Sequence, residues 1–257
     1  MIDCHAHLVD NKFKEDIDDV IHRAKTAGVA KVVVVPEWPS QFDAVFELHE
    51  KYPDFVVPSL GLHPIRKNRK GVNREEIAQL EAALVKYEGR TKCIGEVGLD
   101  YTTELWKIDD ASMEAMRDVL KHEVHLALQY DLPMTVHSRT AHLGTIELLA
   151  ASGAKRVAMH AFGGSADEAL VGAEYGFYFS IPPSFSIGDK GSAVVKAIPL
   201  SNLLLETDSP VLGPVKGQRN EPANLIESAR FIARIKGISE QEVIDATTAN
   251  AKSLFRL

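Results

Sequence analysis

Two histidines one residue apart, His5 and His7, end a short and mostly apolar run at positions 1–7. If this run forms a β-strand, successive side chains alternate between its two faces, so both imidazoles point the same way. Two neighbouring imidazoles at a strand end can act as a pair of metal ligands. The pair therefore predicts a metal site to which other parts of the chain must contribute.

Further histidines and carboxylates follow other short apolar runs in the same manner. They are His63, Glu96, His137, His160 and Asp208, each at or just after the carboxyl end of a predicted strand. In a parallel barrel those strand ends surround a single mouth, which is where active sites lie. Scattered structural histidines would have no reason to share this position, so we expect these side chains to converge.

The predicted ligand set is too large for one tetrahedral zinc ion. It comprises four histidines and two carboxylates, namely His5, His7, His137, His160, Glu96 and Asp208. Two ions with a carboxylate between them suit this set better. Such a pair, about 3.5–4 Å apart, can clamp the attacking and leaving oxygens of phosphoester hydrolysis and lower the pKa of bound water towards about 7. The alternative is that these residues are unrelated polar side chains in loops.

The elements that must position these residues alternate between buried strands and amphipathic helices. Strand candidates lie at 1–7, 31–36, 55–64, 92–97, 132–137, 156–160, 176–181 and 202–208. Helical periodicity predicts helices at 13–27, 41–51, 75–88, 109–130, 141–152, 167–175, 223–236 and 240–255, with a further segment near 192–198. This alternation favours a parallel sheet covered by helices, and eight units in 257 residues favour a closed (β/α)₈ barrel. No linker divides the chain, so we expect residues 1–257 to form one α/β domain.

The composition is that of an ordinary globular protein, with 45% hydrophobic and 25% charged residues. A net charge of −7 gives no sign of a basic surface that coats nucleic acid, so metal ions or a few cations would have to hold a polyanionic substrate locally. The two cysteines, Cys4 and Cys93, fall in predicted buried strands, which favours an intracellular chain with core thiols while leaving a disulfide open. With no signal pattern and no membrane-spanning run, we expect a soluble cytoplasmic monomer, or a nuclear one in a eukaryote.

Seven sequence blocks, in order, resemble the TatD-type metal-dependent deoxyribonucleases within the amidohydrolase-like barrels. They are D-C-H-A-H at 3–7, G-L-H-P at 61–64, I-G-E-V-G-L-D-Y at 94–101, V-H-S-R at 136–139, M-H-A-F-G-G at 159–164, E-T-D-S-P at 206–210 and R-N-E-P at 219–222. The resemblance runs almost from end to end. It implies a binuclear centre with one ion on His5, His7 and Asp208, the other on His137 and His160, and Glu96 between them.

The same resemblance assigns roles around the two ions. His63 would face the scissile phosphate from the rim, and Arg139 would contact a phosphate through its planar donor fork. Glu206 would orient the attacking water or carry a proton, although it could equally be the partner of a ligating histidine. Tyr101 would stack on a base at the mouth or simply pack in the wall.

Some positions depart from the family pattern. Thr102 stands where another aromatic residue often follows Tyr101, and Met116 and Glu123 stand where glutamines are usual. The loop at 102–110 matches no family block. Since this loop is expected to overhang the mouth, the inherited substrate preference is least certain there.

The function implied by the resemblance is hydrolysis of DNA phosphodiesters with two divalent ions, either Zn²⁺, Mg²⁺ or Mn²⁺. A metal-bound hydroxide, held by Asp208 or Glu206, would attack in line, trimming single strands from the 3′ end. One alternative is an amidohydrolase-type hydrolase of a small cyclic amide, lactone or phosphoester. Glu96 counts against this reading, because that group bridges its metals with a modified lysine at the same place. A third possibility is a non-catalytic scaffold with a relic site.

Overall fold

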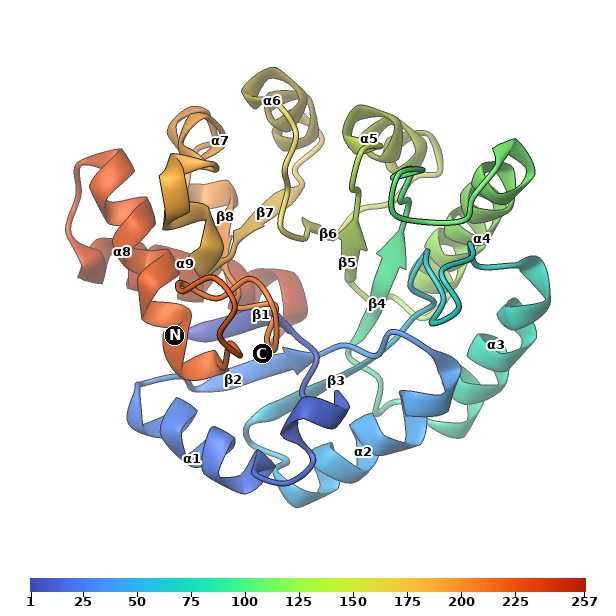
Figure 1. Cartoon of the computed structure of the whole chain (residues 1–257), viewed down its shortest axis with the longest axis horizontal. Helices are drawn as coiled ribbons and strands as arrows, with labels where there is room; N and C mark the ends of the chain where they lie inside the picture. Colours follow the sequence, from blue (N-terminus) through green and yellow to red (C-terminus); the bar gives the residue numbers. More distant parts are fainter.

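Eight short parallel strands form a barrel in the computed structural model, which describes residues 1–257 (Figure 1). They are β1 (Ile2–Ala6), β2 (Lys31–Val34), β3 (Val56–Leu60), β4 (Cys93–Gly98), β5 (Met134–His137), β6 (Val157–Met159), β7 (Tyr178–Ile181) and β8 (Leu203–Leu205). Each strand pairs in parallel with the next along the chain. The predicted (β/α)₈ barrel is confirmed.

Helices surround the barrel on its outside (Figure 1). They are α1 (Ile17–Thr26), α2 (Phe42–Lys51), α3 (Ile77–Lys86), α4 (Asp110–Gln129), α5 (His142–Ala151), α6 (Ala166–Glu174), α7 (Ser192–Ala197), α8 (Leu225–Lys236) and α9 (Glu240–Phe255). A helix follows every strand, and a second one, α9, follows α8. None of these helices is both long and apolar enough to cross a lipid bilayer.

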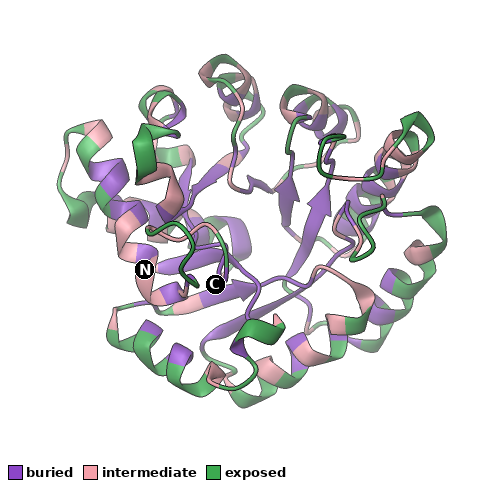
Figure 2. Ribbon diagram, in the orientation of Figure 1, coloured by how far each residue is buried: buried purple, intermediate pink, exposed green.

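The strands are buried on both faces, as their continuous apolar sequences require. The run from Val32 to Val35 is fully buried, and Figure 2 shows the barrel strands as buried and the outer helix faces as exposed. Both cysteines lie in this interior as free thiols, Cys4 in β1 and Cys93 in β4. A crossover helix covers each pair of strands from outside, so both faces of a strand are buried. The strand sequences therefore do not alternate between apolar and polar residues.

The seam between β1 and β8 is closed by the residues that follow β8. The Asp208 amide donates to the His5 carbonyl at 2.9 Å, and the His7 amide donates to the Ser209 carbonyl at 2.8 Å. These two hydrogen bonds join the first and last strands of the barrel. They also bring three of the predicted metal ligands to one place.

Three predicted boundaries differ from the structure by three residues or more, and one of them is that of the strand predicted at 55–64, which ends at Leu60. Phe13 does not begin the first helix but lies in a 3₁₀ turn (Asn11–Phe13) ahead of α1. The predicted strand at 202–208 ends at Leu205, because the Thr207 amide donates to the Asp3 carboxylate at 2.9 Å instead of a neighbouring strand. Asp208 then adopts a left-handed backbone with φ of 54°. The direction of its side chain is therefore set by a turn, and not by the alternation of side chains along a strand.

One carboxyl group is buried between α4 and the segment that follows β3. Glu123 of α4 is 1% exposed, and its Oε1 accepts a hydrogen bond from the Leu62 amide at 2.9 Å. Its other oxygen is buried without a partner. Burial raises the pKa of Glu123 well above its ordinary value, despite the Leu62 hydrogen bond and nearby Arg66.

We expect Glu123→Gln to stabilise the protein at neutral and alkaline pH. Below about pH 4 the carboxyl is neutral in both folded and unfolded chains. As pH rises above that value, the unfolded chain ionises while the native group stays protonated, so wild-type stability falls towards the raised native pKa. The glutamine variant should lack this decline and gain about 1–2 kcal/mol at about pH 8.

Urea denaturation at several pH values measures this difference. Glu114→Gln, on an exposed position of the same helix, is the matched control and should show no such pH-dependent gain. Equal pH dependence for wild type and Glu123→Gln would contradict the interpretation.

Candidate metal centre

Four side chains from three parts of the barrel meet around one point at the mouth. The Nε2 atoms of His5 and His7 lie 3.4 and 3.3 Å from Glu96 Oε2. Asp208 Oδ1 lies 3.7 Å from His5 Nε2 and 3.3 Å from His7 Nε2. Ligand atoms about 2.1 Å from a tetrahedral metal ion are about 3.4 Å apart, so these separations suit a common ion.

The other oxygen of Glu96 faces a different group of histidines. Its Oε1 lies 3.0 Å from His137 Nδ1, 3.6 Å from His63 Nε2 and 3.9 Å from His160 Nε2. The ligand atoms of His63, Glu96 and His137 all lie within 4.8 Å of one another. The two carboxylate oxygens of Glu96 thus point at two adjacent groups of ligands.

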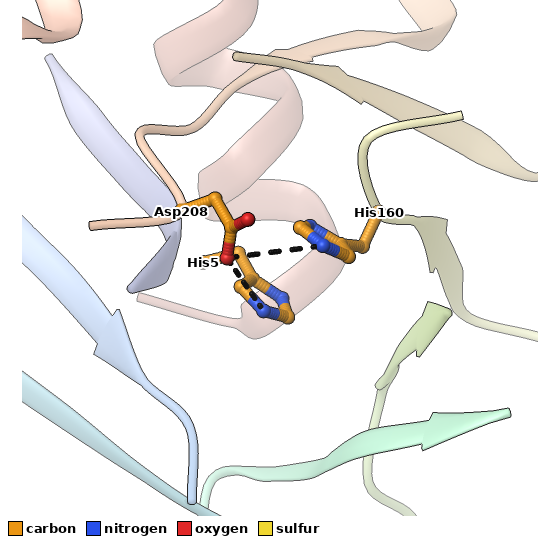
Figure 3. A group of neighbouring side chains, drawn as sticks. All are labelled: His5, His160 and Asp208. Carbon is orange, nitrogen blue, oxygen red and sulfur yellow. Dashed lines mark ion pairs between the residues drawn. The ribbon is translucent and has the colours of Figure 1, made fainter. Parts of the chain in front are cut away.

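His160 joins the two groups. Its Nε2 lies 3.9 Å from Asp208 Oδ1, and its ring stacks on His5 with centroids 3.6 Å apart. Figure 3 shows His5, His160 and Asp208 converging from three segments of the chain. These three form a further group whose ligand atoms could hold a metal ion.

Two of the converging atoms have no hydrogen-bond partner although they are buried. They are His5 Nε2 and Asp208 Oδ1. A buried polar atom left unpaired costs about 1–3 kcal/mol, and coordination of a cation would remove that cost. Imidazole nitrogens together with carboxylate oxygens suit Zn²⁺ and also Mn²⁺. The residues therefore fit a divalent ion.

In each of the four histidines, the ring nitrogen that faces away from the ligand groups has a partner. The pairs are His5 Nδ1 with Thr135 Oγ1 at 2.8 Å, His7 Nδ1 with the Val35 carbonyl at 3.2 Å, His137 Nε2 with Asp100 Oδ2 at 3.0 Å, and His160 Nδ1 with Glu206 Oε2 at 2.9 Å. Such partners fix the orientation and tautomer of a ligating ring. All four rings are thereby held with one nitrogen aimed inward.

Glu206 lies fully buried behind His160. Its Oε2 faces His160 Nδ1 and accepts from Ser180 Oγ, and its Oε1 accepts from the Ala161 amide at 2.9 Å. Both oxygens are occupied, which leaves neither free to hold water. The sequence left two roles for Glu206, namely orienting the attacking water or carrying a proton, and supporting a ligating histidine. The structure favours the second role.

Asp100 is a supporting residue that the sequence reasoning missed. It is fully buried, and its two oxygens accept from His137 Nε2 and the Thr102 amide. Although burial opposes ionisation, the hydrogen bond from His137 leads the contacts that lower the pKa of Asp100. In the sequence, the indication of this role was that Asp100 lies in the block at 94–101, four residues after Glu96.

Gly98 allows the chain to bring Asp100 against His137. Its φ is 139°, and a Cβ atom there would lie 2.0 Å from the His137 carbonyl oxygen. Any side chain at this position would push β4 and β5 apart. The glycine is therefore required for the contact between the two strand ends.

The predicted substrate contacts lie at the rim. His63 is held by the backbone of Ile65, is 16% exposed, and burial lowers its pKa to about 4. Arg139 is half-exposed, with Nε 3.8 Å from Asp100 Oδ2. Tyr101 is partly buried against the core, and its hydroxyl is buried without a partner. His63 and Arg139 thus face the mouth, whereas Tyr101 contributes to its wall.

The ligand set carries protons when no metal is bound. Burial opposes the charge of His160, but the carboxylates of Glu206 and Asp208 raise its pKa to about 9. Hydrogen bonds to Asp208 and Glu96 likewise raise the pKa of His7 against burial. Neighbouring histidines lower the pKa of Glu96 and Asp208 despite burial. Protonated histidines and ionised carboxylates therefore stabilise one another at neutral pH.

Known proteins resemble this chain over its whole length. Residues 2–256 match the sequence profile of a family described as TatD related DNase. The chain is similar to the human protein named deoxyribonuclease TATDN3, with 41% identity over 99% of this chain and 94% of the relative. It is also similar to YabD of Bacillus subtilis, an uncharacterized metal-dependent hydrolase, with 35% identity over 100% of this chain and 99% of the relative. Among solved structures, YjjV of Escherichia coli, a TatD homolog, matches with a TM-score of 0.89 at 28% identity, over 100% of this chain and 98% of that one.

Metal binding should release protons and strengthen as pH rises. With a pKa of about 9, His160 must lose a proton at neutral pH before its Nε2 can coordinate an ion. Affinity should therefore rise about tenfold per pH unit for each proton released, until pH reaches the raised pKa. Calorimetry of Mn²⁺ binding in buffers of different ionisation enthalpy measures the released protons directly. Affinity that does not change between about pH 6 and pH 8 would contradict this picture.

Asp100→Ala should weaken metal binding on the His137 side by about 10–100-fold, because the His137 ring would lose its orienting partner. Asp100→Asn keeps an acceptor for His137 Nε2 and should recover part of the affinity. Elemental analysis and chelator titration measure the change. The exposed Asp167→Ala is the matched control and should bind metal as the wild type does. Unchanged affinity in Asp100→Ala, with unchanged thermal stability, would show that Asp100 does not position His137.

Proposed function

The chain belongs to the family of TatD related DNases, and we propose that it hydrolyses phosphodiester bonds of DNA at two divalent ions in the barrel mouth. Glu96 carries this proposal, because its two oxygens face two separate groups of ligand atoms. His5, His7 and Asp208 would hold one ion with Glu96 Oε2. His137 and His160 would hold the other with Glu96 Oε1. When bound, such ions supply hydroxide at neutral pH and stabilise the leaving oxygen.

The residues of this chain would bind the phosphate and keep it in place. Arg139, half-exposed at the rim, offers the planar donors that suit a phosphate group. His63 is neutral at pH 7, since its pKa is about 4, and can share a hydrogen bond with a phosphate oxygen through Nε2. Both side chains border the ligand set from the solvent side.

Asp208 is the carboxylate that would orient the attacking water. Although burial opposes ionisation, His160 and His7 lower the pKa of Asp208 and keep it ionised. With Oδ1 facing the ligand group, the other oxygen of its partly accessible carboxylate is left for water, whereas both oxygens of Glu206 are occupied. We therefore propose that Asp208 orients the attacking water and that Glu206 supports the His160 ring.

A single strand, cut from its 3′ end, is the form of DNA that we propose as the substrate. The ligands are recessed, with His7, His137, His160 and Asp208 each exposed by 8% or less. A phosphate must enter the mouth to reach them, which a flexible strand end can do more readily than a stiff duplex. The 3′ polarity rests on the family resemblance.

The whole ligand set comes from one chain, so we propose that the protein acts as a monomer.

The other two functions have less support. A modified lysine would be expected at the end of β4 in the amidohydrolase-type alternative, and Glu96 occupies that place. A relic scaffold would have no need of buried, unpaired ligand atoms such as His5 Nε2.

Glu96→Ala should reduce DNA hydrolysis by about 10³-fold or more, because both ions would lose a shared ligand. The assay follows shortening of 3′-labelled and 5′-labelled single-stranded DNA with Mg²⁺, Mn²⁺ or Zn²⁺. Glu174→Ala, an exposed carboxylate at the end of α6, is the control and should keep full activity. Rapid turnover of lactones or cyclic amides with no cleavage of DNA would favour the amidohydrolase alternative instead.

A further inference from the structure

A groove of about 790 Å³ lies at the carboxyl end of the barrel, beside the metal centre. Its walls come from segments that follow β7, β8 and β1, coloured orange and dark blue in Figure 1. Pro210, which lines the groove, is two residues from Asp208. The segment that carries Asp208 therefore runs on into the wall of the groove.

The groove is positively charged in a chain whose net charge is −7. Lys12, Lys190 and Lys216 line it, are exposed and form no ion pair, and no Asp or Glu side chain lines it. A fourth cation, Arg219, is balanced by a salt bridge to Asp16. Three uncompensated ammonium groups around one hollow attract a polyanion, and phosphates are within the reach of such flexible side chains.

Apolar side chains lie between these lysines. Ile187, Val211 and Val215 are 40%, 46% and 50% exposed, and Phe185 is partly exposed beside them. Exposed apolar groups among cations offer a surface to the faces of unpaired bases. A duplex keeps its bases stacked inside and could not use this surface.

Hydrogen bonds join the walls of the groove. The Ser184 amide donates to the Leu212 carbonyl at 2.9 Å, which joins the two main walls. The buried Asn220 side chain donates to the carbonyls of Thr207 at 2.7 Å and Val211 at 2.9 Å. These bonds connect the groove walls to the same segment that carries Asp208.

We propose that this groove binds the nucleotides of a single strand that continue beyond the phosphate held at the metal centre. This inference rests on the proposed function and adds the path of the strand. The lysines contact backbone phosphates, and the apolar side chains contact unstacked bases. On this proposal the groove makes long single strands better substrates than short or paired ones.

The test is a triple variant, Lys12→Ala/Lys190→Ala/Lys216→Ala. It should bind a labelled oligothymidylate of about 10 nucleotides about tenfold more weakly at low salt, and the slope of log affinity against log salt should fall by about two. Hydrolysis of bis(p-nitrophenyl) phosphate, which is too small to reach the groove, should be unchanged. The variant should also lose the advantage that a long oligothymidylate has over a dinucleotide in kcat/KM.

The matched control is Lys67→Ala/Arg69→Ala/Lys70→Ala. These three cations are also exposed, form no ion pair and follow a strand at the same end of the barrel, but they lie outside the groove. They should contribute much less to binding. A second variant, Val211→Ser/Val215→Ser, keeps the charge and should weaken binding of single strands while leaving the salt slope unchanged.

Wild-type affinity in the groove triple variant would overturn the proposal, as would an equal loss in the control. Measuring the binding of the oligothymidylate directly distinguishes this outcome from failure of the proposed function. If the wild type does not cleave DNA, the proposed function fails, whatever the groove variants bind. If the wild type cleaves DNA and the groove variants behave as the control does, only the path of the strand is wrong.

Discussion

The hydrogen bonds that close the barrel are the interaction on which the metal centre depends. The Asp208 amide and the His5 carbonyl join the first and last strands, and the His7 amide and the Ser209 carbonyl extend the same seam. The contacts that close the barrel therefore also hold His5, His7 and Asp208 close together. A β1 strand that slipped by one residue would open the seam and turn both histidines away from the mouth.

Charge balance is the second requirement of this centre. Two carboxylates and four histidines are buried together, and an unpaired buried charge is costly. In the protein without metal, protonated histidines such as His160 compensate Glu96 and Asp208. Divalent cations would take over this compensation, with the outer contacts to Thr135, Asp100 and Glu206 keeping the rings in position. The same contacts therefore balance the buried charges and hold the rings in the positions that ions would need.

The proposed action on DNA requires this acidic protein to attract its substrate locally. The net charge of −7 offers no general attraction for a polyanion. The ions at the mouth, Arg139 at the rim and the lysines of the adjoining groove would together supply it. Placing the cations on loops after β7, β8 and β1 leaves the barrel core free of unpaired charge. Function is then carried by the mouth and its loops, while the opposite end serves stability.

The sequence by itself determined the barrel, the order of its strands and helices, and the polar residues that gather near the carboxyl ends of the strands. These follow from local patterns, because apolar runs, helical periodicity and polar residues at strand ends can be recognised within short windows. The assignment of ligands to two ions and the 3′ polarity were predictions from the family resemblance, and both remain predictions.

Only the tertiary structure determined which residues at the mouth support which others. The contacts of Glu206 with His160 and of Asp100 with His137 join positions 46 and 37 residues apart in the chain. The turn that aims Asp208 depends on Asp3 at the other end of the chain, 204 residues from Thr207. The groove likewise combines three separate loops. Such partners are set by closure of the barrel, and no local pattern in the sequence specifies them.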